Sequence, residues 1–290
     1  MKVLLLASGG DAPGMNAFIA ALYKKFGNNL YACRGGFKGL YDGDIHPISE
    51  FDPLAYKNQA GCCIKTSRFV DFKKPGIFEK AVENAKQFDY VIALGGNGTK
   101  RGVKNLTAAG VKAIFVPATI DNDVEGSDYS IGFISAVNAV IFCVSNIMPS
   151  MASHDRSCIF ETMGRRSSKI AESAAKILNA DYCINSSKDL NKQKIAKIIE
   201  DNYLKNKVSL IIMRENIYYA DALAEELEEL LPSCEIKSVV VGHLQRGFKP
   251  TQSELSIAKD FARATIKIVK SGVAPVALLM REGKVFADKI

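Results

Sequence analysis

The sequence lacks several patterns that would place it in a specialised class. Its seven cysteines form no C-x-x-C pair and no zinc-ligand spacing, which excludes the common zinc modules. It has no low-complexity segment and no repeat of solenoid period. Its lysines and arginines are scattered, and no nucleic-acid-binding motif accompanies them. No apolar run suggests a membrane span of about 20 residues. We therefore expect a cytoplasmic protein with no nucleic-acid partner and no membrane association.

The cysteines also argue against a disulfide framework. Their number is odd, and several lie in apolar runs such as residues 141–144. Cysteines of this kind are typical of buried free thiols in a reducing compartment. We expect no disulfide bond.

The composition is that of an ordinary folded chain. Of the 290 residues, 48% are hydrophobic and 24% are charged, which argues against wholesale disorder. The formal net charge of +7 suits an anionic ligand such as a phosphate ester without requiring one.

Short apolar runs alternate with helical patterns along the whole chain. Such runs, each followed by a glycine- or aspartate-bearing turn and then a helix, are typical of parallel β-α-β units. The expected strands are residues 2–6, 90–94, 113–117, 158–160, 182–184, 208–213, 236–241 and 275–280. Helices are expected to end near residues 26, 109 and 178, to begin near 131, and to span about 190–202, 220–231 and 254–269.

This alternation predicts an α/β fold of two Rossmann-like, doubly wound lobes with mainly parallel sheets and a cleft between them. We expect a larger, nucleotide-binding lobe over residues 1–135 and a smaller, sugar-phosphate-binding lobe over 136–245. Residues 246–290 are expected to return towards the larger lobe.

Two glycine-rich turns follow expected strands and suit phosphate binding. Residues 9–14 and 95–99 each combine glycines with the start of a helix. Glycine lets the backbone approach a phosphate, and a helix N-terminus favours an anion. A plain tight turn into a helix explains the first segment equally well and the second segment less well. Neither is a Walker A loop, because G-x-x-x-x-G-K-[ST] does not occur in the chain.

A third turn, residues 119–123 (Thr-Ile-Asp-Asn-Asp), is more specific. It places Asp121 and Asp123 together just after an expected strand. Neighbouring carboxylates repel and need a metal ion, a substrate hydroxyl or a helix to cap. Phosphoryl transfer uses one carboxylate to take a hydroxyl proton and another to hold Mg²⁺. We favour that chemistry over helix capping.

Cationic side chains lie near expected strand ends and glycines. Arginine suits phosphate through its bidentate fork, and the set, rather than any one member, indicates a phosphate ester. Its members are Arg68, Arg156, Arg165, Arg166 and Arg246, with His243 close to the last.

Taken together, these motifs resemble the bacterial-type, ATP-dependent 6-phosphofructokinases. The matching segments, in the family's order and spacing, are residues 9–16, 95–98, 117–123, 163–165 and 242–247. The resemblance implies phosphorylation of the 1-hydroxyl of fructose 6-phosphate by ATP and Mg²⁺, giving fructose 1,6-bisphosphate in glycolysis.

The resemblance also implies a role for each matching residue. Asp121 would be the general base, with Thr119 and Arg68 steadying the transferred phosphoryl group, and Asp123 would help to hold Mg²⁺. The nucleotide site would comprise Gly10, Tyr41, Lys73, Gly98 and Thr99. The sugar would be bound by Met163, Gly164, Arg165 and Glu215, and its 6-phosphate by His243 and Arg246. Arg156 and Lys237 would reach that phosphate from a neighbouring subunit, which implies an oligomer, by resemblance a homotetramer.

Two features concern the phosphoryl donor and the metal. Gly98 and Ala118 are small where pyrophosphate-using members carry Asp and Lys, which favours ATP. Asn97 stands where the family's metal loop usually carries Asp, so activity is expected to be reduced, because Mg²⁺ prefers carboxylates. A third difference concerns the sugar phosphate. Lys237 stands where the family usually has Arg, so it lacks the paired donors with which a guanidinium binds two phosphate oxygens.

Two alternatives remain at the level of sequence. A kinase related to the NAD and lipid kinases would share the 95–99 loop but would lack residues 119–123 and 243–247 as they stand here. A catalytically silent phosphofructokinase-like chain that binds ligands or regulates a partner would explain Asn97. Binding without turnover would identify the silent chain.

Overall fold

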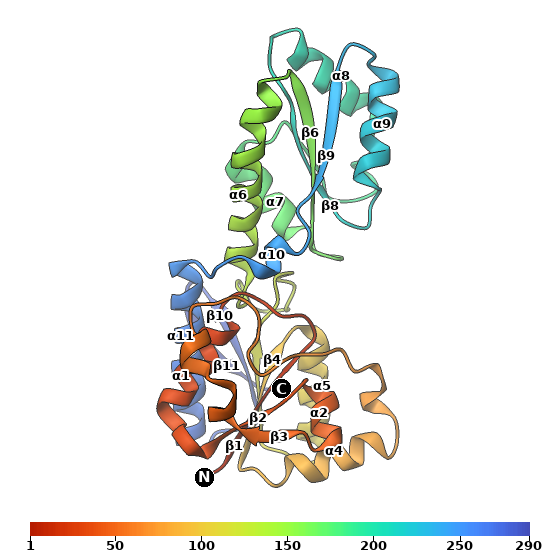
Figure 1. The fold of residues 1–290 in the computed structure, drawn as a ribbon. Helices are drawn as coiled ribbons and strands as arrows, with labels where there is room; N and C mark the ends of the chain where they lie inside the picture. The colour runs from red at the N-terminus through yellow and green to blue at the C-terminus, as the bar shows by residue number, and fades with distance from the viewer. The chain divides into compact units, whose positions relative to one another are not determined.

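The computed structural model describes all residues from 1 to 290, in two compact units (Figure 1). Unit 1 comprises residues 1–134 and 249–290, and unit 2 comprises residues 135–248. Each unit is built around one sheet with helices on its faces. The chain leaves unit 1 once and returns to it once.

The sheet of unit 1 has seven strands in the order β11-β10-β5-β4-β1-β2-β3. Its inner strands are parallel, and the edge strands β3 and β11 are antiparallel to their neighbours. Strands β1, β4 and β5 are buried along their whole length, as expected for strands covered on both faces. The bounds are β1 Val3–Ser8, β2 Leu30–Cys33, β3 Ile45–Pro47, β4 Tyr90–Gly95, β5 Ala113–Pro117, β10 Val276–Arg281 and β11 Lys284–Asp288.

Helices cover the sheet of unit 1 on both faces. One core joins the sheet to α2, α4 and α5, while α1 packs against α11. The α-helices are α1 Met15–Phe26, α2 Phe37–Asp42, α3 Pro53–Tyr56, α4 Ile77–Ala85, α5 Asn97–Ala108 and α11 Gln252–Ser271. Three 3₁₀ turns complete the unit: η1 Gly27–Asn29, η2 Ile48–Phe51 and η3 Val70–Lys73.

The sheet of unit 2 has four parallel strands in the order β7-β8-β6-β9. Helices α8 and α9 share one apolar core with the sheet, and α6 and α7 lie on the other side (Figure 1). The bounds are β6 Arg156–Thr162, β7 Tyr182–Ile184, β8 Leu210–Arg214, β9 Glu235–Val240, α6 Phe133–Ala152, α7 Lys169–Leu178, α8 Lys192–Tyr203, α9 Ala220–Leu230 and α10 Leu244–Gly247.

Helix α6 is the most apolar helix-forming segment of the chain. By length and composition alone it could cross a membrane, although 44% of its most apolar window is buried inside the protein. The expectation that no segment approaches a membrane span is therefore wrong for α6. The core helix of a soluble protein meets the same criteria, because both environments select apolar side chains. Phe142 of α6 is 53% exposed.

The predicted α/β class and the predicted elements are confirmed. All eight expected strands are present, each within a few residues of its predicted bounds. The pattern missed β2, β3 and β11, which are short or carry charged residues. These lie at or near sheet edges, where pairing with a neighbour rather than a continuous apolar run makes the strand.

The expectation of free cysteines is confirmed, since none forms a disulfide. Cys33, Cys158 and Cys234 are buried, and the other four are partly exposed. Burial raises the pKa of Cys158 to about 12, so this thiol stays protonated and unreactive at neutral pH.

Candidate active site

The carboxyl ends of three strands of unit 1 lie in one row. The register pairs Ser8 of β1 with Gly95 of β4, and Gly95 with Pro117 of β5. The loops after these strands therefore start at the same level of the sheet. Loops that follow adjacent parallel strands form the usual ligand site of an open α/β sheet. The three turns singled out in the sequence are thus brought together.

A fourth segment, residues 66–68, joins this row. Ser67 bridges Ser8 in parallel, and its carbonyl accepts the Gly9 N–H at 3.0 Å. The Thr66 hydroxyl donates to the Gly9 carbonyl at 3.1 Å. The exposed Arg68 is thereby held beside the carboxyl end of β1, where the sequence pattern alone gave no element to place it.

The 95–99 loop is fixed to β1 by a buried hydrogen bond. The Thr99 hydroxyl donates to the Ser8 carbonyl at 2.9 Å. A Cβ on Gly95 would lie 2.2 Å from Thr99 Oγ1 and 2.4 Å from the Ser8 carbonyl oxygen, so this position requires glycine. A Cβ on the exposed Gly98 would meet nothing within 4 Å. The loop is rigid at its base and open at Gly98.

Asn122 shapes the 119–123 loop. Its φ of 49° is left-handed, a region that Asn tolerates better than most residues. Its amide donates to the Asp128 carbonyl at 2.8 Å, and its side-chain oxygen accepts the Ser130 N–H at 2.7 Å. The Ser130 hydroxyl donates to the Thr119 carbonyl at 2.7 Å. Asn122 is therefore a structural residue between two candidate functional carboxylates.

The two carboxylates of this loop lie in different environments. Asp121 is only 7% exposed, and its N–H donates to the Thr119 hydroxyl at 3.3 Å. Asp123 is exposed, and its carboxylate makes no hydrogen bond or ion pair within the chain. Two acids in contrasting environments suit different tasks, such as proton transfer and cation binding.

Asn97 links the β4 and β5 loops. Its amide donates to the Asp123 backbone carbonyl at 3.0 Å. A carboxylate at position 97 could not donate this bond and would face an oxygen. The hydrogen bond explains how the loops stay together with an amide at this position.

The structure contains no cluster of three or more His, Cys, Asp or Glu side chains that could cage a metal. The exposed carboxylate of Asp123, with the Asn97 amide group beside its backbone, fits an ion that arrives with its other ligands. Mg²⁺ behaves in this way, since it binds through one or two carboxylates together with phosphates and waters. The donor set therefore fits a nucleotide-borne Mg²⁺ and not a dedicated protein cage.

The other candidate nucleotide residues come from separate elements of unit 1. Gly10 follows β1, Tyr41 lies on α2 and the exposed Lys73 ends η3. Tyr41 stacks on Phe69 with ring centroids 6.0 Å apart, and Lys80 Nζ lies 4.8 Å from the Tyr41 ring centroid. Phe69 follows Arg68 directly and so connects these residues to the row of strand ends.

In unit 2, the loops after β6 and β8 meet at Glu215. One oxygen of Glu215 accepts the N–H groups of Gly164 and Arg165, at 3.0 and 2.8 Å. The Glu215 N–H in turn donates to the Thr162 carbonyl at 2.8 Å. A Cβ on Gly164 would lie 2.4 Å from the Ser167 carbonyl oxygen, so this turn requires glycine. Glu215 holds the turn that presents the exposed Arg165.

The loop after β9 joins the same edge through Gln245. The Val241 N–H donates to the Glu161 carbonyl at 2.9 Å, and the buried Gln245 side chain accepts the Met163 N–H at 3.3 Å. His243 is exposed and Arg246 is half-buried, both at α10 in this loop. The carboxyl edge of unit 2 thus gathers the six residues expected to bind the sugar phosphate: Met163, Gly164, Arg165, Glu215, His243 and Arg246.

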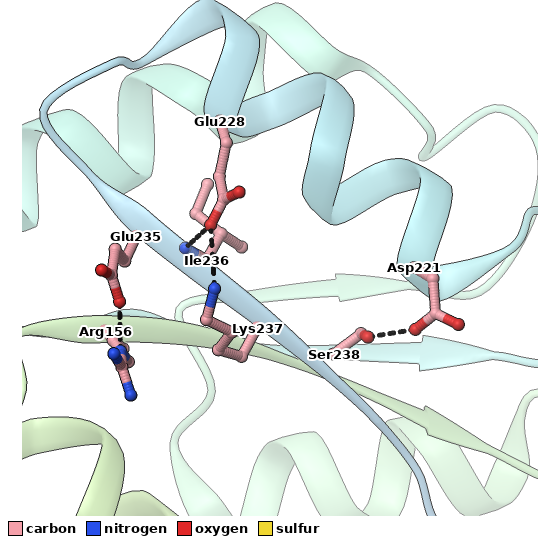
Figure 2. Close-up of polar contacts among 7 residues, drawn as sticks. All are labelled: Arg156, Asp221, Glu228, Glu235, Ile236, Lys237 and Ser238. Carbon is pink, nitrogen blue, oxygen red and sulfur yellow. Dashed lines mark hydrogen bonds and ion pairs between the residues drawn. The ribbon is translucent and has the colours of Figure 1, made fainter.

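Arg156 and Lys237 do not lie at this edge. Arg156 begins β6 and pairs in register with Glu235, and Lys237 pairs with Cys158. At about 3.3 Å per residue, Arg156 lies about 20 Å along the strand from Thr162. The fold therefore separates Arg156 from the rest of the set, and Figure 2 shows Lys237 on the strand beside it.

Sequence reasoning missed several residues that shape these edges. Ser130 carries no pattern that would distinguish it, and Gln245 lies in the 242–247 motif but was given no role. Glu254 is fully buried and accepts the Gly132 N–H at 2.8 Å. The Thr251-x-x-Glu254 spacing is a capping-box signal, and Thr251 does cap α11. The signal predicted the helix start and not the tie to Gly132.

The fold and these two groups of loops define an α/β protein suited to phosphorylated ligands. Acids lie at the carboxyl ends of the strands of unit 1, and cations lie at the carboxyl ends of the strands of unit 2. The phosphofructokinase family model matches residues 2–269. The chain belongs to the phosphofructokinase family.

Relatives named ATP-dependent 6-phosphofructokinase match nearly the whole chain. The relative from Vibrio campbellii is 34% identical over 277 residues, covering 93% of this chain and 86% of the relative. That from Streptococcus sanguinis is 31% identical over 295 residues, covering 100% and 88%. That from Mycoplasmopsis pulmonis is 32% identical over 297 residues, covering 100% and 91%.

Solved phosphofructokinases share the fold. Pichia pastoris phosphofructokinase in the T-state superposes with a TM-score of 0.87 at 24% identity, over 99% of this chain and 34% of that chain. This chain therefore spans about a third of the length of the yeast chain. A pyrophosphate-dependent phosphofructokinase from Nitrosospira multiformis superposes with a TM-score of 0.85 at 19% identity, covering 99% and 82%. At these identities the likeness concerns the fold.

Proposed function

We propose that this chain transfers the γ-phosphoryl group of ATP to the 1-hydroxyl of fructose 6-phosphate, giving fructose 1,6-bisphosphate, as a glycolytic kinase. The observation that carries the proposal is the row of strand ends in unit 1, which sets Asp121 and Asp123 beside two glycine turns. Membership of the family and the names of the relatives support the same reaction.

Asp121 is assigned as the general base. Its burial keeps bulk water from competing for the proton of the sugar's 1-hydroxyl, and Asn122 fixes the backbone on which it stands. A positioned base contributes roughly 10²–10⁴-fold to a rate. Thr119 and Arg68 are assigned to the transferred phosphoryl group, because both stand at the same row of strand ends.

Mg²⁺ carried by ATP would be held by Asp123, with Asn97 offering a neutral oxygen. When bound, the ion neutralises charge on the phosphates. The unpartnered carboxylate of Asp123 supports this assignment. Asn97 contributes no negative charge, so we expect a weaker metal site than one with an aspartate there.

The nucleotide is assigned to Gly10, Tyr41, Lys73, Gly98 and Thr99. The open space at Gly98 leaves room for a nucleotide, and the start of α5 offers N–H groups to phosphate. The small Gly98 and Ala118 favour ATP over pyrophosphate as the donor.

The sugar phosphate is assigned to the carboxyl edge of unit 2. Arg165, His243 and Arg246 supply positive or donor groups there, and Glu215 holds the turn around Gly164. Arginine forks bind phosphate oxygens in pairs of hydrogen bonds. Met163 completes the set at the end of β6.

Arg156 and Lys237 are assigned to the 6-phosphate bound by a second copy of the chain. Their places support this, because Arg156 begins β6 and Lys237 is in register with Cys158, so both strands run on from these cations towards the sugar edge of their own unit. We propose a homotetramer in the cytoplasm.

A coupled assay of fructose 1,6-bisphosphate formation tests the proposal, using this chain and N97D with ATP and Mg²⁺. We expect turnover by this chain and faster turnover by N97D, by tenfold or more, which is roughly 1.4 kcal/mol of transition-state stabilisation. Without Mg²⁺, N97D should be less stable to urea by about 0.5–1.5 kcal/mol, because the bond to the Asp123 carbonyl is lost.

Each outcome of this assay has a distinct meaning. Equal rates for the two proteins would show that Asp123 suffices for the metal. Turnover with pyrophosphate but not with ATP would overturn the assignment of ATP as the phosphoryl donor. Both proteins could bind fructose 6-phosphate and yet form no product. That result would overturn the proposed kinase activity and favour a catalytically silent chain that binds ligands.

A further inference from the structure

Arg156 and Lys237 are each paired with a glutamate of their own chain (Figure 2). Arg156 Nε donates to Glu235 Oε2. Lys237 Nζ lies 3.4 Å from Glu228 Oε1. The register Arg156↔Glu235 and Cys158↔Lys237 puts both cations on the same face of neighbouring strands. The four charges therefore form one group at the start of the edge strand β9 and of its neighbour β6.

The contact with Glu235 leaves most of the Arg156 guanidinium available. Glu235 is bound through Nε alone, and the two terminal nitrogens have no partner within the chain. In Figure 2 these nitrogens point away from Glu235. The terminal nitrogens make up the edge of the guanidinium that can bind two oxygens of a phosphate. The ion pair thus orients Arg156 without occupying its phosphate-binding edge.

Glu228 is held in place by a second contact besides the one with Lys237. The oxygen that contacts Lys237 also accepts the Ile236 N–H at 2.7 Å. Glu228 on α9 is therefore anchored to β9 at the residue next to Lys237. An ammonium has three donors, so one contact leaves two for another anion.

The energies decide whether these glutamates aid or oppose phosphate binding. Exposed ion pairs contribute little to stability because solvent screens them, and they are too weak to keep a phosphate dianion out. A free Arg or Lys side chain loses rotamer freedom when it binds a ligand, and two neighbouring cations also repel. Holding both side chains in advance removes part of that cost. Arg156 holds the pKa of Glu235 below its usual range, so Glu235 stays charged at neutral pH.

We propose that Glu235 and Glu228 are positioning residues, which hold Arg156 and Lys237 ready for the phosphate of a sugar bound by a second copy of the chain. This inference rests on the proposed function, because it takes the assignment of both cations from it. Neither glutamate touches the substrate. They act through the two cations.

The test is steady-state kinetics with fructose 6-phosphate and ATP varied separately, for E235A, E235Q, E228A and the control E225A. Glu225 is exposed on α9 and makes no side-chain contact. For E235A we expect a KM for fructose 6-phosphate raised about 3- to 10-fold, or roughly 1 kcal/mol. Its kcat and KM for ATP should change less than about twofold. E235Q should fall between E235A and the parent chain, because its amide oxygen still accepts from Nε.

A double-mutant cycle separates positioning from a general effect on folding. In an R156A background, E235A should have no further effect on the KM for fructose 6-phosphate, because Glu235 acts only through Arg156. E228A should behave likewise in a K237A background. Additive effects would show that the glutamates do not act through these cations and would overturn the inference.

The remaining outcomes are also decisive. A lowered KM in E235A would mean that the glutamate competes with substrate, the opposite of the inference. An active parent chain with unchanged KM in both glutamate variants would overturn this inference alone. A parent chain that does not phosphorylate fructose 6-phosphate would overturn the proposed function and, with it, this inference.

Discussion

The carboxyl edges of the two sheets are built in different ways. In unit 1, hydroxyl and amide side chains such as Thr99, Asn97 and Ser130 cross-link the loops, and the key acid Asp121 is buried. In unit 2, a carboxylate, Glu215, holds the turn that presents an exposed cation. The difference matches the chemistry proposed for each unit. Proton transfer requires a shielded, fixed acid, whereas capture of a phosphate monoester requires accessible donors.

Replacing the buried Asp121 should have the largest effect on kcat and should leave sugar-phosphate binding by unit 2 unchanged. We expect D121N to lower kcat by roughly 10²–10⁴-fold, because an amide cannot take the hydroxyl proton. Equilibrium dialysis should show fructose 6-phosphate still bound with little change. D201N, an exposed substitution on α8, is the control. A fall in sugar binding as large as the fall in kcat would contradict the division of labour between the units.

Removing a cation of unit 2 should give the opposite profile. R246A is expected to raise the KM for fructose 6-phosphate by roughly 10- to 150-fold, since a hydrogen bond from a charged group contributes about 1.5–3 kcal/mol. The KM for ATP should change little. R263A, on an exposed part of α11, should match the parent chain. An effect of R246A on ATP alone would show that this edge does not bind the sugar phosphate.

The smallest expected effect concerns Glu161 of β6, close to the sugar edge. Burial, with smaller contributions from Glu215 and Asp221, raises the pKa of its carboxyl. A raised pKa in the folded state means that the ionised form destabilises the fold. The loss of stability is largest at pH values above the folded-state pKa. It disappears as the pH falls towards the pKa of Glu in the unfolded chain, about 4.3.

E161Q should therefore stabilise the protein at pH 7.5 by a few tenths of a kcal/mol, because solvent screens a half-exposed group. The gain should shrink at pH 5. Urea unfolding at both pH values measures it, with E225Q as the exposed control on α9. A gain that grows as the pH falls would contradict the raised pKa.

Much of the fold could be predicted from the sequence because the central strands are covered on both faces. Residues 90–95 and 113–117 are continuous apolar runs, and both proved to be buried strands. Helix α5 begins at Asn97, within the glycine turn that follows the first of these runs. Edge strands such as β3 and β11 were missed, because their pairing depends on a neighbour far away in the chain or on a short turn.

The candidate site was predicted only in part. The motifs singled out candidate residues, and the family resemblance implied roles for them, but neither gave a position. No pattern in the sequence indicates that Asn97 donates to the Asp123 carbonyl or that Gln245 accepts from Met163. Hydrogen bonds of this kind depend on how separate loops meet.

The sequence by itself determined the buried central strands, most helices and the family, because buried parallel strands and phosphate-binding turns each require particular residue types in a particular order. Tertiary structure alone decided which turns share an edge. It joined Ser67 to Ser8 across 59 residues and Glu254 to Gly132 across 122. It also put Arg156 at the start of β6 and Lys237 close to it on β9. The physical reason is that strand register and long-range pairing are set by the packing of whole elements, and no local pattern specifies them.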